Sequence, residues 1–368
     1  KLMGFKCGIV GLPNVGKSTL FNALTQSNKA EAANYPFATI EPNIGRVAVP
    51  DQRLKILSKI SKSKKTIPTF IDFVDIAGLV KGASKGEGLG NKFLSHIREV
   101  DTIVQVVRCF EDGNITHVSD IIDPIRDIDI IETELKLADL ETLENKMIST
   151  KQKSKSGEKI YSMQIEVISD LQDKINKNIS INDLDYSEEK LNFFKSLNLI
   201  TSKPMLYIFN VEENSIKSGN HFTDIIKKKL ELKDNNFVIV SASIESQISE
   251  FDNENDKLEL LEQLGLKETT LNKVIRTGYS LLNLKTFFTS GEQETRAWTI
   301  KNGSTAQNAA GKIHSDFEKG FIRAETIAYE DFVKYNGETS SREAGKLRQE
   351  GKEYKVKDGD VFHFLFNL

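Results

Sequence analysis

Eight residues close to the start of the chain could bind the phosphates of a nucleotide. Residues 11–18 read GLPNVGKS, which matches the spacing G-x-x-x-x-G-K-[ST] at every fixed position. The glycines let the backbone turn so that successive N–H groups point at phosphate oxygens. Lys17 supplies a positive charge for the β- and γ-phosphates, and Ser18 supplies a hydroxyl for Mg²⁺. The motif therefore predicts a site for a nucleoside triphosphate.

The residues on either side of this loop fit a strand and a helix. The apolar run Cys7–Val10 is typical of a buried strand, and residues 19–24 begin a helical pattern. A helix that starts here would direct its N-terminal N–H groups at the phosphates. We therefore expect the nucleotide to be bound by Asn14, Val15, Gly16, Lys17, Ser18 and Thr19.

A second motif, DIAG at residues 75–78, follows the apolar run Thr69–Val74. P-loop NTPases use an aspartate and a glycine at such a strand end to hold Mg²⁺ and to sense the γ-phosphate. Between the two motifs, Thr39 lies in a segment rich in proline and small residues and is a candidate switch threonine; the alternative is an ordinary surface loop. We expect Mg²⁺ to be held by Ser18, Thr39 and Asp75, and the γ-phosphate to be contacted by Gly78.

The residues expected to face the base depart from the guanine-specific pattern. GTPases present Asn-Lys-x-Asp after a strand, whereas residues 210–213 here read NVEE. Asn210 keeps its place, but Val211 stands where a lysine stem would cover the ring. Glu213 stands where an aspartate would accept both N–H groups of guanine, and its extra methylene displaces the carboxylate. Each buried polar group of guanine that is left without a hydrogen-bond partner costs about 1–3 kcal/mol of binding free energy. This pattern therefore argues against strong guanine selectivity. A further loop on the base side is matched by Ser241, Ala242 and Ser243.

Bulk composition narrows the classes of function. With 368 residues, 39% of them hydrophobic and 28% charged, the chain is long enough for two or three domains. Its net charge of −3 does not indicate a protein whose overall charge attracts polyanions, and DNA is not an expected partner. The two cysteines suggest neither a disulfide framework nor a zinc site. No apolar stretch is long enough to cross a bilayer, and we expect a cytoplasmic protein with no membrane partner.

Patterns of apolar residues divide the chain into three regions. Residues 3–128 and 204–280 alternate strand-like runs with helical patterns and are expected to form an α/β P-loop NTPase domain with a doubly wound, mostly parallel sheet. Residues 129–203 carry apolar stripes at helical spacing and predict an inserted, coiled-coil-like helical hairpin. Residues 281–368 predict a small α+β module.

The C-terminal module is predicted from three strand-like runs and one helical pattern, namely Thr295–Ile300, Ala324–Ile327, Val361–Phe366 and Thr305–Phe317. Its basic stretch is suited to contact with RNA phosphates, and the alternative is a solvated charged face. The stretch consists of Lys312, His314, Lys319 and Arg323.

Taken together, these motifs resemble those of the YchF/Obg-like ATPase family, an Obg-related group of P-loop NTPases. The resemblance covers essentially the whole chain from Met3, and residues 314–324 resemble part of a TGS domain, a ubiquitin-like β-grasp module. It implies an ATPase that accepts GTP more weakly and that associates with the ribosome, and the basic stretch of the TGS domain is then the candidate contact with rRNA. It also implies that Asn14 helps to hold K⁺ in addition to the expected Mg²⁺. The N-x-x-E pattern is this family's usual departure from N-K-x-D.

The group that drives hydrolysis is less well defined than the nucleotide site. Ras-like enzymes orient the attacking water with a glutamine directly after D-x-x-G, but that place holds Leu79 here. Lys17 is a catalytic candidate through its charge. His117, in a polar loop, could position or deprotonate water, and the family resemblance points to it as well; the alternative is a solvent-exposed loop histidine. Two other functions stay open: a guanine-specific GTPase of translation, and a nucleotide-stabilised binding module with incidental hydrolysis.

Overall fold

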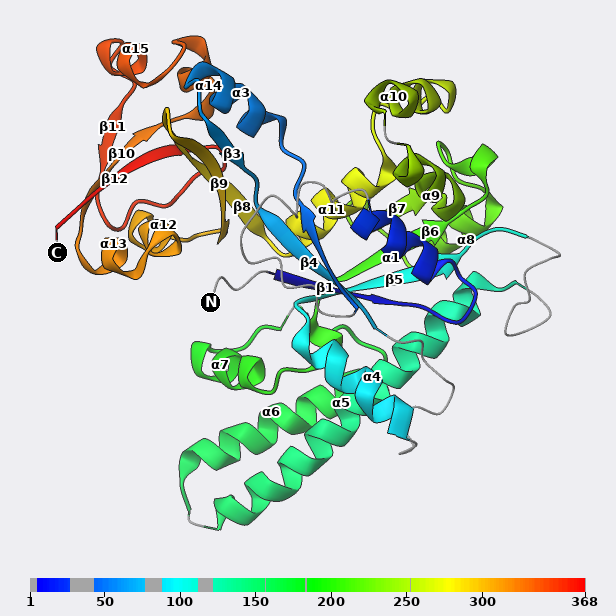
Figure 1. The fold of residues 1–368 in the computed structure, drawn as a ribbon. Helices are drawn as coiled ribbons and strands as arrows, with labels where there is room; N and C mark the ends of the chain where they lie inside the picture. Colours follow the sequence, from blue (N-terminus) through cyan, green and yellow to red (C-terminus); the bar gives the residue numbers. More distant parts are fainter. Residues whose placement is uncertain are drawn as a thin grey trace.

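In the computed structural model, the described part of the chain is organised by two mixed six-stranded sheets (Figure 1). The structure describes residues 5–26, 43–76, 88–111, 122–155, 157–182, 184–251 and 253–367. The first sheet belongs to the predicted P-loop domain, and the second lies mostly in the C-terminal region. Among the described helices, none combines the length and the apolarity that a bilayer crossing requires.

The first sheet has the strand order β2-β4-β1-β5-β6-β7. All neighbouring pairs are parallel except β2 with β4, which confirms a mostly parallel α/β fold. The central strands are apolar because helices cover both faces, and every residue of β5 is buried. The sequence predicts all of these strands except β2, from the short apolar runs Cys7–Val10, Thr69–Val74, Thr102–Val107, Met205–Phe209 and Phe237–Val240. Their bounds are β1 (Phe5–Val10), β2 (Ile44–Ala48), β4 (Phe70–Asp75), β5 (Thr102–Arg108), β6 (Met205–Asn210) and β7 (Phe237–Val240).

Helices pack on both faces of this sheet (Figure 1). One face carries α1 (Lys17–Gln26), α9 (Ala242–Glu250) and α11 (Thr270–Leu281). The other carries α4 (Gly88–Glu99), the first part of α5 (Pro124–Ser154) and α8 (His221–Lys229). The remaining elements of this region are α7 (Glu188–Ser196), α10 (Glu254–Gln263) and the short 3-10 helices η2 (Ile200–Ser202) and η3 (Glu213–Ser215).

A helical arm formed by α5 and α6 (Lys159–Asn176) extends away from the sheet (Figure 1). The arm packs on itself through a separate apolar cluster that includes Leu143, Val167 and Leu171. Its first helix begins at Pro124, before the predicted start near 129, because the Asp123 side chain accepts a hydrogen bond from the N–H of Arg126 and proline suits the first turn.

The second sheet has the order β11-β10-β12-β8-β9-β3. Its apolar face packs on α12 (Ala306–Ile313) through a cluster that includes Phe287, Ala309 and Phe362. The predicted helix around 305–317 is two helices, because His314 is extended and separates α12 from α13 (Ser315–Lys319). The other elements are α14 (Tyr329–Lys334), α15 (Glu338–Glu343), β8 (Leu284–Ser290), β9 (Glu294–Lys301), β10 (Phe321–Ile327), β11 (Arg348–Glu350) and β12 (Val361–Phe366).

One edge of the second sheet comes from the N-terminal part of the chain. Between β2 and β4, the chain leaves the first sheet to form α3 (Gln52–Ile60) and β3 (Lys65–Ile67), and β3 pairs in parallel with β9. Leu54 and Leu57 of α3 pack in one cluster with residues of the C-terminal sheet, among them Phe288. We call residues 51–67 the crossover segment. From the sequence this segment is expected to belong to the P-loop domain, because its strand is only three residues long and shows no clear periodicity.

Candidate nucleotide site

The phosphate-binding motif forms the predicted turn between β1 and α1. Asn14 and Gly16 both adopt left-handed backbone conformations, with φ of 63° and 94°. At Gly16 a side chain would also collide with the amide of Asn210, so glycine is required there for two reasons. The helix begins at Lys17, and the exposed Ser18 and Thr19 lie in its first turn. The N–H groups of this turn lie where helices bind anions.

Asp75 reaches the phosphate loop through the pairing of β1 with β4. Asp75 lies opposite Ile9 in this register, and the N–H of Ile76 donates to the Ile9 carbonyl at 3.1 Å. The Asp75 carboxylate forms an ion pair with the ammonium group of Lys17, and the two side chains are only 20% and 12% exposed. The structure therefore brings together the two charged groups that the sequence assigns to metal and phosphate binding.

Asn210 joins the phosphate loop to the base-side loop. Its Nδ2 donates to the carbonyl of Val15 at 2.9 Å, and its Oδ1 accepts from the N–H of Ala242, also at 2.9 Å. All three residues are buried. The sequence predicts that this asparagine faces the purine. That its amide also links two loops is not evident from the sequence, because these contacts depend on the pairing of β6 with β7.

The other base-side residues differ in how they are placed. Val211 is 2% exposed and belongs to an apolar cluster with Phe209, so its side chain packs into the domain core. Glu213 is exposed at the start of η3. Ser241 is buried, and its hydroxyl lies 3.0 Å from that of the exposed Ser243. A lysine stem that could cover a purine ring is therefore absent at position 211, as the sequence indicates.

Glu212, between Val211 and Glu213, has a structural role that is not evident from the sequence. Its carboxylate accepts hydrogen bonds from the Ser215 hydroxyl and from the amide of Asn220, the latter at 3.1 Å. Partial burial acts to raise the pKa of Glu212, but these hydrogen bonds outweigh it and hold the pKa below its ordinary value. Because Asn220 also caps α8, this network fixes the turn that presents Glu213.

Three predicted site residues, Thr39, Gly78 and His117, lie outside the described residues, as does Leu79. The basic stretch of the C-terminal region is described, and all of its members are exposed. They lie at the end of α12 (Lys312), at the start and end of α13 (His314 and Lys319) and in β10 (Arg323).

The described donor groups fit Mg²⁺. Ser18 offers a hydroxyl oxygen and Asp75 a carboxylate oxygen, and both are hard ligands of the kind that Mg²⁺ takes beside phosphate oxygens. Ser18 comes from the first turn of α1, which follows the phosphate loop, and Asp75 comes from the end of β4, which pairs with the strand β1 that precedes the loop.

Comparison with known proteins gives two family matches. Residues 6–153 match a family described as 50S ribosome-binding GTPase. Residues 284–367 match the family of the YchF GTPase C-terminal domain, described as a protein of unknown function.

Similar proteins match along the whole chain. A protein of Haemophilus influenzae named ribosome-binding ATPase YchF is 54% identical over 366 residues, with 100% of both chains covered. A protein of Bacillus subtilis with the same name is 52% identical over 368 residues, again with 100% of both covered. The solved structure of the Schizosaccharomyces pombe YchF GTPase is 39% identical, covers 98% of both chains and superposes with a TM-score of 0.87.

Proposed function

Because this chain belongs to the YchF/Obg-like ATPase family, we propose that it is a ribosome-associated switch protein that binds and hydrolyses ATP and accepts GTP more weakly. The observation that carries the choice of base is the pair of residues after β6. Val211 is packed into the core, and Glu213 carries a longer side chain than the aspartate that reads guanine. The site therefore lacks the ring cover and the carboxylate position on which guanine selectivity depends.

The chain's own residues have distinct tasks in this proposal. The N–H groups of residues 14–19 surround the β- and γ-phosphates, and the ammonium group of Lys17 balances their charge. Ser18 and Asp75, with Thr39 from the first switch segment, would hold Mg²⁺. Mg²⁺, when bound, neutralises the charge that develops on the phosphate oxygens. We further propose Gly78 as a γ-phosphate contact, His117 as the group that orients water, and Asn14 as a K⁺ ligand.

The ribosome is the proposed macromolecular partner because the similar proteins are named for binding it. We propose that the C-terminal region, as a TGS domain, contributes contacts with rRNA. A protein that works on ribosomes is expected in the cytoplasm.

Calorimetric titration with ATP and with GTP in the presence of Mg²⁺ tests the choice of base. We expect tighter binding of ATP, and we expect Glu213→Asp to improve GTP binding because the shortened carboxylate returns toward the guanine edge. Glu250→Asp, at the exposed end of α9, is the matched control. Much tighter binding of GTP by the unmodified protein, or no binding of either nucleotide, would contradict the proposal.

A further inference from the structure

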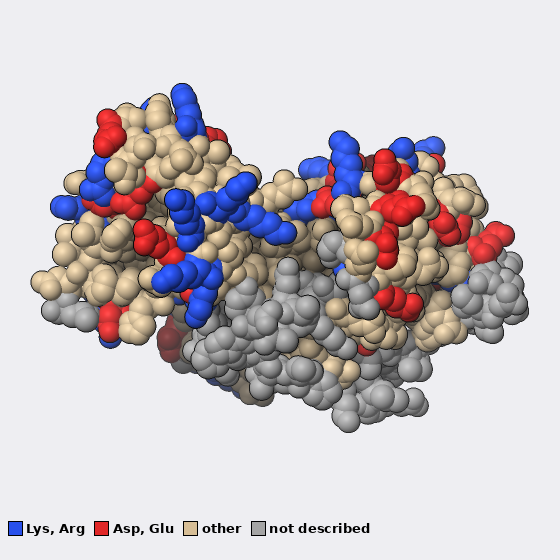
Figure 2. Space-filling model, turned by 45° about the horizontal axis from the view of Figure 1, so that its top comes forward, with Lys and Arg blue, Asp and Glu red and all other residues tan. Residues whose placement is uncertain are grey.

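The second sheet carries a histidine and two carboxylates that could bind one metal ion. Within the residues that the structure describes, Glu325, Glu338 and His363 bring one ligand atom each to within 4.8 Å of the others. Acidic and basic side chains lie interspersed over this lobe of the surface, on the left in Figure 2, so carboxylates alone would not mark a site. The imidazole beside them does, because it is a preferred ligand of transition metals.

Two of the three residues are placed by the pairing of β10 with β12. Glu325 and His363 are direct partners in this antiparallel register, so their side chains project from the same face of the sheet. Phe364, next to His363, projects from the other face into the cluster with α12. Ile327 and Val361 lie two positions along the two strands and pack in one cluster with leucines of α3. The histidine and the first glutamate therefore lie on the face that α3 covers in part.

The third residue, Glu338, begins α15 and is placed by the turn that follows α14. The N–H of Gly337 donates to the carbonyl of Phe332 at 2.9 Å. The hydroxyl of the buried Ser341 donates to the carbonyl of Gly337 at 2.7 Å. Phe332 is itself buried in the cluster that contains Leu54 and Leu57 of α3. These contacts fix the backbone from which the Glu338 side chain extends.

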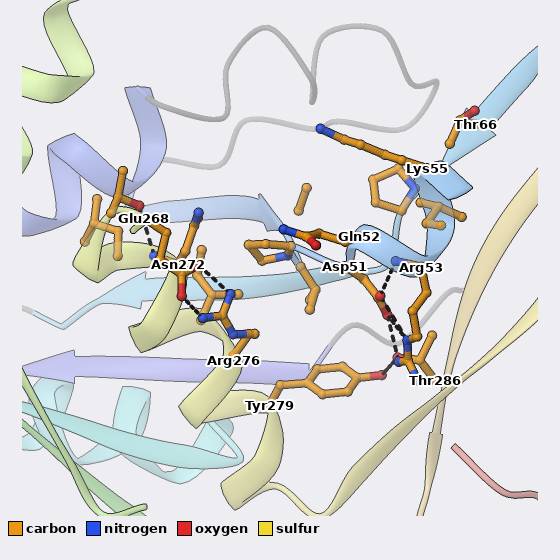
Figure 3. A pocket seen from close by; sticks show the side chains of 18 of the residues that line it. Asp51, Gln52, Arg53, Lys55, Thr66, Glu268, Asn272, Arg276, Tyr279 and Thr286 are labelled. Carbon is orange, nitrogen blue, oxygen red and sulfur yellow. Dashed lines mark hydrogen bonds and ion pairs between the residues drawn. The ribbon is translucent and has the colours of Figure 1, made fainter. Parts of the chain in front are cut away.

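Helix α3 holds this face of the sheet in place. Arg53 of α3 pairs with Asp51, which caps the helix, and with Asp358, which precedes β12 (Figure 3). At the other end of α3, a Cβ atom on Gly337 would lie 3.5 Å from the side chain of Ile60. The three candidate ligands thus extend from elements that are fixed to one another, as a metal site requires.

A small cavity is lined by all three side chains. Its volume is about 10 Å³, and its lining also includes the apolar side chains of Ile327 and Phe332. This is about the space that one water molecule needs, so the cavity suits a single ion and excludes an organic ligand. An apolar surround also limits the access of water to a bound metal ion.

Arg342 uses only part of the ligand capacity of the two carboxylates. Its Nη2 donates to Oε2 of Glu325 at 3.2 Å and to Oε1 of Glu338 at 2.9 Å. Within the described part of the chain, the other oxygen of each carboxylate accepts no hydrogen bond. The Arg342 side chain is 54% exposed, and exposed ion pairs contribute little to stability. A divalent cation can therefore displace the guanidinium group, which otherwise keeps two like charges side by side.

We propose that Glu325, Glu338 and His363 bind one divalent transition-metal ion, with Zn²⁺ as the ion that the ligands match, and that this ion joins α15 to β10 and β12. Zn²⁺ takes histidine nitrogen and carboxylate oxygen at about 2.0–2.2 Å, and three protein ligands leave one position for water. Rotation of the exposed His363 and the half-buried Glu338 side chains brings the three atoms onto one ion. The inference does not depend on the proposed nucleotide hydrolysis, since Mg²⁺ prefers sites built from oxygen ligands alone.

The test is a calorimetric titration of untagged full-length protein with ZnCl₂, after metal removal with EDTA and dialysis. Excess Mg²⁺ is present throughout to fill oxygen-only sites, and no nucleotide is added. We expect one Zn²⁺ to bind per chain. His363→Gln should weaken binding by more than about 10-fold, because loss of a partner one shell further from a metal already costs about 10–100-fold. His96→Gln, at an exposed position in α4, is the matched control and should bind normally.

Two further variants act in opposite directions. Glu338→Gln should weaken Zn²⁺ binding, with Glu343→Gln at an exposed position of the same helix as its control. Arg342→Gln should tighten binding, because it removes the group that competes for the same carboxylates. Equal losses in Arg342→Gln and Glu338→Gln would overturn the inference, because they would show a cluster held by ion pairs and not by a metal.

Thermal unfolding gives an independent measurement. The midpoint of the unmodified protein should rise with Zn²⁺ concentration, because an ion that binds only the folded state stabilises it. The midpoint of His363→Gln should not rise, and in EDTA it should equal that of the unmodified protein, since His363 is exposed. Zn²⁺ binding that is unchanged in His363→Gln, or that excess Mg²⁺ abolishes, would overturn the inference.

Discussion

At the scale of single residues, the nucleotide site depends on side chains that bind other parts of the protein as well as on those that would touch a ligand. Asn210 is the clearest case, since it bridges Val15 and Ala242. The phosphate loop and the base-side loop are therefore fixed relative to each other by one amide. Lys17 and Asp75 also fix each other, through their ion pair.

Asn210→Ala is expected to weaken both stability and ATP binding. The change leaves the buried carbonyl of Val15 and the buried N–H of Ala242 without this partner, which costs about 1–3 kcal/mol of unfolding free energy. Denaturant unfolding and ATP calorimetry measure the two effects. Asn214→Ala, at an exposed position in η3, is the control and should change neither. An Asn210 variant with full stability would show that the bridge contributes little.

At the scale of elements, the base of the helical arm is fixed by a buried carboxylate. Asp139 of α5 is 1% exposed and accepts hydrogen bonds from the N–H groups of Ile200 and Thr201, at 2.8 and 2.7 Å, and from the Thr201 hydroxyl at 2.7 Å. These bonds join the arm to the chain that returns into β6. Burial raises the pKa of Asp139 above its ordinary value of 3.8, and this effect exceeds the opposing effect of the hydrogen bonds.

This pKa gives stability a definite pH dependence. Because the folded state holds the Asp139 proton to a higher pH than the unfolded chain does, this group's contribution to stability is greatest below pH 3.8 and falls as pH rises through the raised folded pKa. Asp139→Asn does not titrate. We therefore expect the wild type to lose stability relative to the variant as pH increases over this range, as measured by denaturant unfolding at a series of pH values. A difference that does not vary with pH would contradict this account.

The sequence predicts an element well where one local pattern defines it. It predicts an element poorly where the element depends on contacts with distant parts of the chain. The apolar run Thr102–Val107 predicts the buried strand β5, and the P-loop motif predicts a helix directly after the loop, although α1 begins at Lys17, two residues before the predicted pattern. By contrast, β3 has three partly exposed residues, and it is a strand only because β9 lies beside it. The bridging role of Asn210 was equally hidden, since its two partners are far apart in the sequence.

At the scale of the whole molecule, the crossover segment ties the two sheets together. Leu57 of α3 is fully buried, in one cluster with Phe288 and Phe332 of the C-terminal region. Arg53 of the same helix pairs with Asp358, which precedes β12. The two sheets should therefore unfold together, although their cores are separate.

Leu57→Ala is expected to destabilise the whole molecule by about 2–5 kcal/mol, because it opens a cavity in a buried cluster. The single tryptophan, Trp298 in β9, reports on the second sheet by fluorescence, while circular dichroism follows all helices. Both signals should shift to the same lower midpoint. Leu258→Ala, at a leucine that is 59% exposed in α10, should have little effect. Two separate transitions would show that the sheets are not coupled.

The route of the crossover segment has a consequence for dissection of the molecule. Its strand and helix are encoded before residue 68, yet their packing partners Phe288, Ala297 and Phe332 all come after residue 283. A fragment ended between the two sheets would keep Leu54 and Leu57 but lack the surface that shields them from water. The nucleotide-binding half is thus not expected to be stable alone. Removing the C-terminal region would expose a buried apolar interface to solvent and would promote aggregation.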